Sequence, residues 1–217
     1  MKNFTLILLL LFAFSGNLEC QEYFVEGIEE EPRMTLKTNP LSMIQGPIFL
    51  CSEYRLCYER LIKPGQSMQV SVSYLGKSYY VILSEAMMDD PYHFKISGMR
   101  FTAEYRLFHT MLWGKKNALK GLYAAPYISW ASAKISDDYS MTFNEYIKAT
   151  YQNYCLKTGY QTIKGKFVLD FFVGIGYRNN VWTEHRNYNF SVLDNDDLEI
   201  FPGHLKLLAG FNAGMTF

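Results

Sequence analysis

The residues LKLLAGFNAGMTF (Leu205–Phe217) form the most regular pattern in this chain. Every second position is apolar, in the order Leu205, Leu207, Ala209, Phe211, Ala213, Met215 and Phe217. The positions between them hold Lys206, Leu208, Gly210, Asn212, Gly214 and Thr216. Successive side chains of a β-strand point to opposite faces, so this alternation predicts a strand between two unlike environments, one apolar and the other polar and cramped.

The same alternation recurs along the chain and predicts a protein built from strands. We expect eight of them, at residues 34–43, 48–62, 67–75, 94–108, 119–133, 150–163, 166–178 and 205–217. The Pro64–Gly65 pair predicts a tight turn between the second and third strands. The run Tyr79–Leu83 is also β-prone, and it either extends a strand or belongs to a ten-stranded arrangement.

The expected connections alternate in length. If both termini lie on one side, the links on that side are 63–66, 109–118 and 164–165, and those on the other side are 44–47, 76–93, 134–149 and 179–204. Long polar loops on one side and shorter turns on the other are typical of a barrel that crosses a membrane. The expected fold is therefore all-β, an eight-stranded antiparallel transmembrane β-barrel of the outer-membrane type.

The N-terminus has the pattern of an export signal. Lys2 precedes an apolar run from Phe4 to Phe14, and a polar segment follows. We predict a signal peptide at residues 1–20, cleaved after Cys20, then a periplasmic leader at 21–33 and the barrel at 34–217. A lipoprotein interpretation of Cys20 conflicts with Glu19, because a small residue normally precedes a lipidated cysteine.

The polar face of the strands distinguishes a membrane barrel from a soluble one. A soluble lipocalin-like barrel also alternates, but it is apolar inside and charged outside. Here glycines are mixed with charged residues on one face, and glycine is kept where backbones or side chains approach closely. A narrow, side-chain-filled lumen explains that mixture better than a solvent-facing surface. The glycines of this face are Gly98, Gly159, Gly174, Gly176, Gly210 and Gly214.

Four segments resemble a family of small bacterial outer-membrane β-barrels. They are EYRLCYER (53–60), GYQ (159–161), VLDFFVGIGYR (168–178) and GFNAGMTF (210–217). The family consists mostly of outer-membrane β-barrel domains of unknown function, with an OmpA-transmembrane-like or OmpX-like architecture. The resemblance covers about residues 34–217 and implies the fold and an outer-membrane location. It supplies no catalytic residues, and the cysteines on the polar face are not typical of the family.

The charged residues of the polar face are of both signs. In a narrow interior, opposite charges must pair or lose their hydration at a large cost, so we expect an interlocked structural network. An open conducting path is the alternative, but eight strands leave a lumen that side chains just fill. The residues expected in this lumen network are Glu53, Arg55, Glu59, Arg100, Glu104, Arg106, Asp170 and Arg178, with Lys157 and Gln161 on the same face.

The sequence gives weaker indications of a catalytic site or a metal site. His185, Ser191 and Asp194 share one outer loop and can be arranged on paper as a triad, yet such residues are common in loops. The acidic run Asp194–Asp197 with Glu199 lacks the spacing of a calcium loop. Cys51 and Cys57 lie roughly 20 Å apart along one strand, too far for a disulfide, whereas a Cys57–Cys155 bond is conceivable. We predict no catalytic residue, cofactor or metal.

The composition limits the partners. Basic and acidic residues number 21 each, which gives no general attraction to nucleic acid. Aromatic residues make up 17%, as expected where rings lie at membrane interfaces. We therefore expect a monomeric, non-enzymatic protein of the cell outer membrane that contacts lipid. Its long outer loops would serve adhesion, surface contact or envelope integrity by binding a surface ligand or envelope protein. The alternatives are a small passive channel and a lipid-modifying enzyme.

The predicted outer loops are also rich in aromatic residues, which favours a recognition surface on a rigid scaffold. These residues are Tyr139, Phe143, Tyr146, Trp182, Tyr188 and Phe190.

Overall fold

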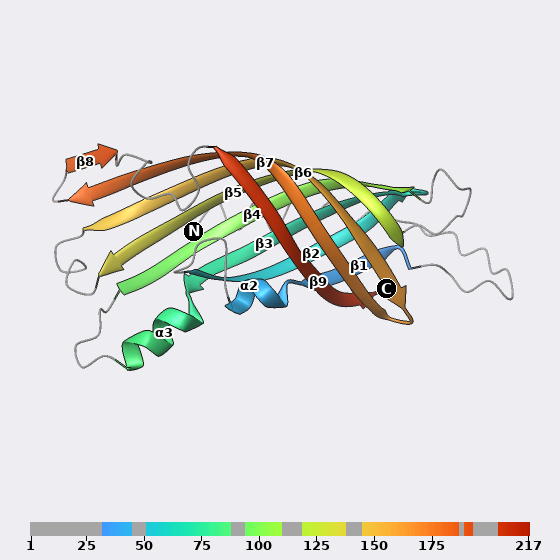
Figure 1. Cartoon of the computed structure of the whole chain (residues 1–217), viewed down its shortest axis with the longest axis horizontal. Coiled ribbons are helices and arrows are strands. Elements are labelled where there is room, and N and C mark those ends of the chain that lie inside the picture. Colours follow the sequence, from blue (N-terminus) through green and yellow to red (C-terminus); the bar gives the residue numbers. More distant parts are fainter. Residues whose placement is uncertain are drawn as a thin grey trace, which may run out of the picture. The chain divides into compact units, whose positions relative to one another are not determined.

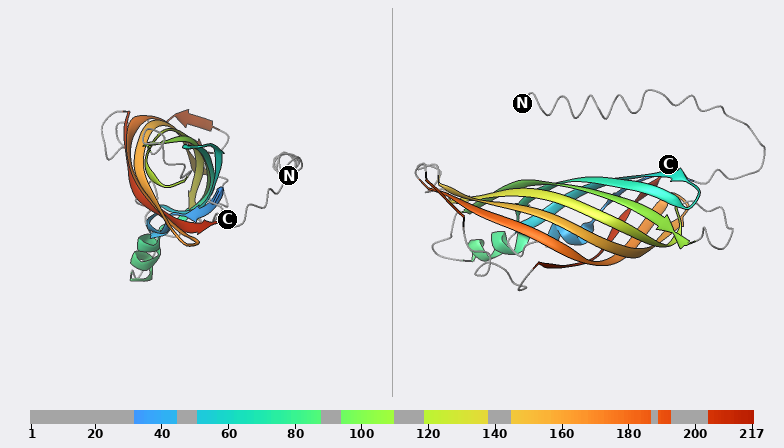
Figure 2. Two further views of the ribbon diagram at one scale, coloured as in Figure 1. Left: turned by 90° about the vertical axis from the view of Figure 1, so that its right-hand side faces the viewer. Right: turned by 90° about the horizontal axis from the view of Figure 1, so that it is seen from above.

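The protein forms a closed, antiparallel β-barrel of eight strands (Figures 1 and 2). The computed structural model describes residues 32–44, 51–87, 94–109, 119–137, 145–186, 189–192 and 204–217. The barrel strands are β1 (Met34–Thr38), β2 (Cys51–Lys63), β3 (Gln66–Lys77), β4 (Phe94–Phe108), β5 (Gly121–Asp137), β6 (Tyr146–Lys164), β7 (Phe167–Arg186) and β9 (Leu205–Thr216). Each strand pairs with its neighbour in the chain, and β1 pairs with β9 to close the ring. The predicted signal peptide and most of the leader lie outside the described residues.

Three further elements lie outside the barrel wall. The short strand β8 (Asn189–Val192) pairs with the far end of β7, and the helices are α2 (Pro40–Ile44) and α3 (Tyr79–Ala86). None of the helices in the described ranges is long and apolar enough to cross a membrane.

The two helices correct two predictions from the sequence. The first strand ends at Thr38 rather than at residue 43, because the chain turns into α2 at Pro40. The run Tyr79–Leu83 is helical, not a strand, so the ten-stranded alternative is wrong. The side chain of Ser78 accepts a hydrogen bond from the backbone N–H of Tyr80 and caps α3, which favours the helix over an extended conformation.

The two ends of the barrel differ. At one end, here called the turn end, β2 and β3 are joined by a tight turn at Pro64–Gly65, and β6 and β7 by a turn at Gly165–Lys166. Both glycines have positive φ, 73° and 59°, which tight turns require and most residues avoid. The opposite, loop end carries α3 and β8. There β5, β6 and β7 run several residues further than predicted.

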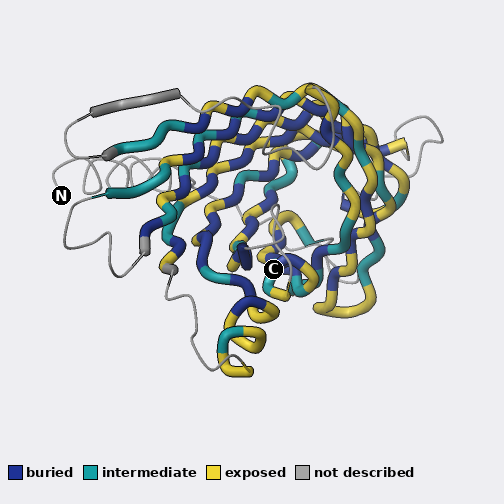
Figure 3. The backbone as a smooth tube through the Cα atoms, turned by 60° about the vertical axis from the view of Figure 1, so that its left-hand side comes forward, coloured by how far each residue is buried: buried dark blue, intermediate teal, exposed yellow. Residues whose placement is uncertain are grey.

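The strand faces agree with the alternation in the sequence. Along β3, β4 and β9, large apolar side chains point outward and are exposed, while the polar residues between them are buried in the lumen (Figure 3). The closing strand has the predicted register: Leu205, Leu207 and Met215 are exposed, whereas Lys206 and Asn212 are buried. Among the described residues, the interior is thus mainly polar and the outer surface mainly apolar.

Glycine permits the close approach of strands at the lumen face. A Cβ atom on Gly98 would lie 2.7 Å from the Cα of Ala133 on β5. One on Gly214 would lie 2.6 Å from the Cα of Lys37 on β1. Both distances are too short for any side chain, so these positions need glycine for packing.

The wall is incomplete between β2 and β9 because β1 is short. β1 pairs with β9 only from Ala213 to Thr216, so the edge of β9 from Leu205 to Asn212 has no strand beside it on that side within the described residues. Helix α2 lies next to this edge and next to β2 (Figure 1). On the β2 side, side chains continue the hydrogen bonding beyond β1: the Thr38 hydroxyl donates to the Arg55 carbonyl (2.7 Å) and the Ser42 hydroxyl to the Glu53 carbonyl (2.9 Å).

Candidate functional site

The lumen near the turn end holds a closed network of charged side chains, here called the turn-end cluster. Its members come from five strands and are listed together: Lys37, Glu59, Glu104, Arg106, Lys157 and Asp170. Three cations face three carboxylates, so the cluster is neutral. All six side chains are almost fully buried, and the alternation of the strands places each of them inside the barrel.

Arg106 on β4 lies at the centre of the turn-end cluster. Its guanidinium donates to Asp170 Oδ2 (2.8 Å) and to Gln161 Oε1 (2.8 Å), and it also pairs with Glu104. It stacks over the Tyr123 ring, with 4.3 Å from the guanidinium carbon to the ring centroid. A planar group with five donors can join several acceptors at once, which lysine cannot do in the same geometry.

The carboxylates of the cluster are fully engaged by other groups. The ammonium of Lys37 lies 2.6 Å from Glu59 Oε2, and Glu59 also accepts hydrogen bonds from the Ser67 hydroxyl and the Gln161 amide. Asp170 accepts from the Tyr123 hydroxyl at 2.7 Å. Buried ions that are paired and hydrogen-bonded on every side form a rigid plug rather than a vacant site.

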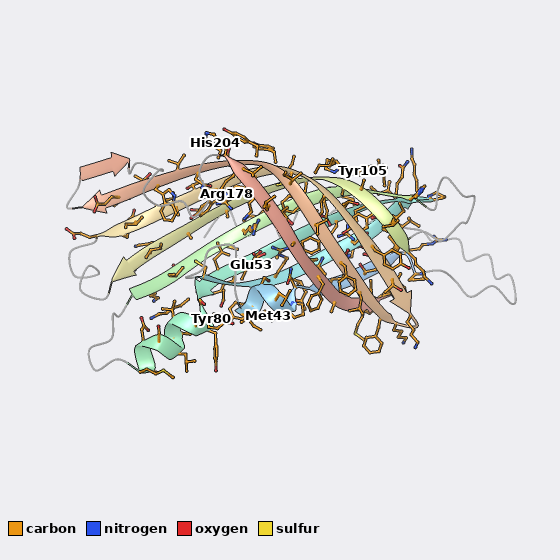
Figure 4. The ribbon with its side chains drawn as sticks, viewed as in Figure 1. Met43, Glu53, Tyr80, Tyr105, Arg178 and His204 are labelled. Carbon is orange, nitrogen blue, oxygen red and sulfur yellow. The ribbon has the colours of Figure 1, made fainter. Side chains whose placement is uncertain are left out.

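A second group, the loop-end cluster, is unlike the first. It consists of Glu53, Arg55, Arg100, Arg178 and Lys206, four cations and one carboxylate. Arg55 donates from Nε and Nη2 to Glu53 Oε1 (2.9 and 2.8 Å), and Arg100 Nη1 donates to Glu53 Oε2 (3.0 Å). Glu53 is therefore shared by two arginines, and Figure 4 labels it inside the barrel together with Arg178.

Two cations of the loop-end cluster have no counter-ion. Neither the ammonium of Lys206 nor the guanidinium of Arg178 forms an ion pair within the described ranges. Lys206 is nonetheless 91% buried, since only 9% of its surface is exposed. The Nε of Arg100 is buried without any hydrogen-bond partner. The loop-end cluster thus has an excess of positive charge.

The structure brings together most of the residues expected in the lumen network. Seven of the eight take part in ion pairs, in two groups rather than one; Arg178 lies in the lumen but forms no ion pair with a described residue. Sequence reasoning missed Lys37 and Tyr123 as members. The signal for Lys37 was present, because Thr35 and Lys37 alternate with Met34 and Leu36.

The described residues do not form the triad, the metal site or the disulfide that the sequence analysis considered. His185 lies on β7 rather than in a loop and stacks on Tyr146 with ring centroids 4.2 Å apart, whereas the acidic run Asp194–Asp197 and Glu199 lie outside the described residues. No group of three His, Cys, Asp or Glu side chains in the described ranges is placed to hold a metal ion. Cys51, Cys57 and Cys155 are free, buried thiols, so the conceivable Cys57–Cys155 disulfide is not formed.

Comparison of this chain with protein-family models, with curated proteins and with solved structures gave no match.

Proposed function

We propose that this protein is a non-enzymatic β-barrel of the bacterial outer membrane that holds its loop end at the cell surface for contact with a ligand or another envelope component. The observation that carries the proposal is the reversal of polarity across the wall. Large apolar side chains such as Leu156 (63% exposed) and Val173 (56%) cover the outside, whereas the buried side chains inside are mainly polar and include a network of ion pairs. A barrel in water would expose the opposite faces.

The difference between the two ends supports the surface role. Tight turns close two connections at the turn end, whereas the loop end carries α3 and the extended strands β5 to β7. On α3, Tyr79 is 61% exposed and Tyr80 48%. Exposed aromatic rings on a rigid scaffold are suited to binding a partner.

Membrane location is tested by expressing the full chain in a Gram-negative host and separating its membranes. We expect the protein in the outer-membrane fraction, extracted only by detergent, and migrating differently on gels with and without heating. A protein that stays in the aqueous fraction after removal of membranes would contradict the proposal.

The surface role is tested by binding of whole cells to a panel of host glycans and envelope proteins. We expect binding to fall when Tyr79 and Tyr80 are both replaced by Ala, while the barrel still folds. Equal binding by cells with and without the protein would contradict this role.

The turn-end cluster also argues against a passive channel, because its side chains fill the lumen near the turn end. Planar bilayers that contain the purified barrel should show no discrete conductance steps. Regular steps at each insertion would mean that the lumen conducts and that the channel alternative is correct.

A further inference from the structure

A cavity of about 220 Å³ lies at the incomplete part of the wall, between α2, β2 and β9. Four successive residues of β9 line it, from Lys206 to Ala209. Lys206 and Leu208 point into the lumen and Leu207 and Ala209 point outward, so the cavity lies along the edge of β9, where it meets residues of both faces. We call it the lateral cavity.

Within the described residues, no strand pairs with the outer edge of β9 from Leu205 to Asn212, which leaves that edge accessible. β1 pairs with β9 only as far as Ala213, and α2 lies beside the opening, in contact with β2 and β9. A Cβ atom on Gly210 would lie 3.2 Å from the amide nitrogen of Asn39, so the chain that precedes α2 packs closely against β9 at this point, and the opening lies beside Leu207 and Ala209. The lateral cavity therefore joins the lumen to the apolar outer surface.

The inner part of the lateral cavity is positively charged. Arg55, Arg100 and Lys206 line it, and Glu53 is the carboxylate of the loop-end cluster among them. Arg100 and Lys206 also line a smaller cavity next to Arg178. Burying unpaired cations is costly unless an anion joins them. Such a group of cations around a cavity matches one anionic group.

The outer part of the lateral cavity is apolar. Leu41 of α2 and Leu207 and Ala209 of β9 line it. Leu41 is 50% exposed and Leu207 57%, so the same side chains continue onto the outer surface of the barrel. A ligand that fits both parts has an acidic headgroup and a hydrocarbon chain.

We propose that the lateral cavity binds one anionic amphiphile, with its carboxylate or phosphate headgroup at Lys206 and Arg100 and its acyl chain along Leu207 and Ala209 on the outer wall. The volume of the cavity is about seven times the roughly 30 Å³ that a water molecule occupies in the liquid. That space suits a headgroup and a few methylenes, and the rest of the chain lies in lipid. This inference rests on the membrane location proposed above.

The test is equilibrium binding of radiolabelled hexadecanoate to the full chain in phosphatidylcholine nanodiscs. We expect one molecule bound per barrel, displaced by unlabelled hexadecyl phosphate but not by hexadecanol or by inorganic phosphate at the same concentration. Lys206→Gln should weaken binding at least tenfold. Lys134→Gln is the matched control, because Lys134 is an exposed lysine on the outside of β5 and should leave binding unchanged.

The lateral route is tested with Ala209→Trp, which fills the outer mouth of the cavity. It should lower the affinity at least tenfold, whereas Ile128→Trp, an exposed outward position on β5, should not. If Lys206→Gln or Ala209→Trp bound as tightly as the native chain, the proposal would be wrong. Equal binding of hexadecanol, or full competition by inorganic phosphate, would also overturn it.

The same experiment distinguishes an incorrect binding site from an incorrect membrane location. Membrane insertion is measured first, as the fraction of folded barrel recovered with the nanodiscs before any ligand is added. A barrel that inserts but binds no hexadecanoate contradicts only the lateral site, while a chain that does not insert contradicts the membrane location.

Discussion

At the scale of single residues, the interior depends on charge balance. Asp170 accepts hydrogen bonds from Arg106, Tyr123 and Asn212, and lies 3.5 Å from the ammonium of Lys37. Each buried ion loses hydration at a cost of several kcal/mol, and only pairing with good geometry offsets this loss. The six ions of the turn-end cluster therefore stabilise one another. Removal of any one leaves an oppositely charged neighbour buried with fewer partners to offset its lost hydration.

Asp170→Asn should destabilise the barrel by about 3–5 kcal/mol, because it leaves a buried cation without its partner while keeping the shape of the side chain. The measurement is the free energy of unfolding in urea, in lipid vesicles. Glu85→Gln is the comparison, since Glu85 of α3 forms a single ion pair with Lys77 at the loop end, away from the turn-end cluster, and its loss should cost less than the loss of Asp170.

A double substitution separates charge pairing from packing. Lys37→Met with Glu59→Met removes one cation and one carboxylate and should be less destabilising than Glu59→Met alone. If the double variant were the less stable of the two, charge balance would not be what holds the cluster together.

The sequence predicted which residues enter the lumen but not which of them meet. Alternation along one strand assigns Arg106 and Asp170 to the inside. Their contact depends on how far each strand is shifted along the next one around the barrel. This shift cannot be read from the sequence of a single strand. The same limit hid the separation into two clusters and the fact that Arg178 forms no ion pair with a described residue.

At the scale of elements, the strands were predictable because each carries its own pattern. β4 begins and ends at the predicted residues, 94 and 108, and the turn at Pro64–Gly65 is where the sequence placed it. The helices were not predicted. Tyr79–Leu83 has strand-like composition, but the Ser78 cap favours α3.

The pairing of β1 with β9, here called the seam, closes the barrel and can be tested with a single substitution. Gly214→Val should prevent its closure, because a Cβ there meets the backbone of Lys37. Loss of the heat-sensitive gel shift of the folded barrel is the measurement. Ala213→Val, one residue away on the opposite face, should keep that shift. A folded Gly214→Val barrel would show that the seam tolerates a wider spacing.

At the scale of the whole molecule, the apolar outer surface predicts how the barrel responds to charge at different depths. Leu156 lies near the middle of β6 and is 63% exposed, whereas Phe167 begins β7 at the turn end and is 68% exposed. The two positions are equally open but differ in distance from the barrel's ends.

In a bilayer, Leu156→Arg should therefore destabilise the barrel by about 2–4 kcal/mol and Phe167→Arg by about 0–1 kcal/mol, because a charge is costliest at the bilayer midplane. Unfolding in guanidinium, followed in vesicles, gives both values. Equal effects at the two positions would mean that no hydrocarbon layer surrounds the middle of the barrel.

The pairing of β1 with β9 also governs how the ring can assemble. These strands come from opposite ends of the described chain, so their contact closes a loop of nearly the whole polypeptide, which carries a larger entropy cost than any hairpin. The hairpins are local and can form early, whereas the contact between β1 and β9 needs both ends of the barrel to be present and forms late. Until that contact forms, each intermediate has two strand edges with unpaired backbone N–H and C=O groups, and these edges can pair with other chains unless they are shielded.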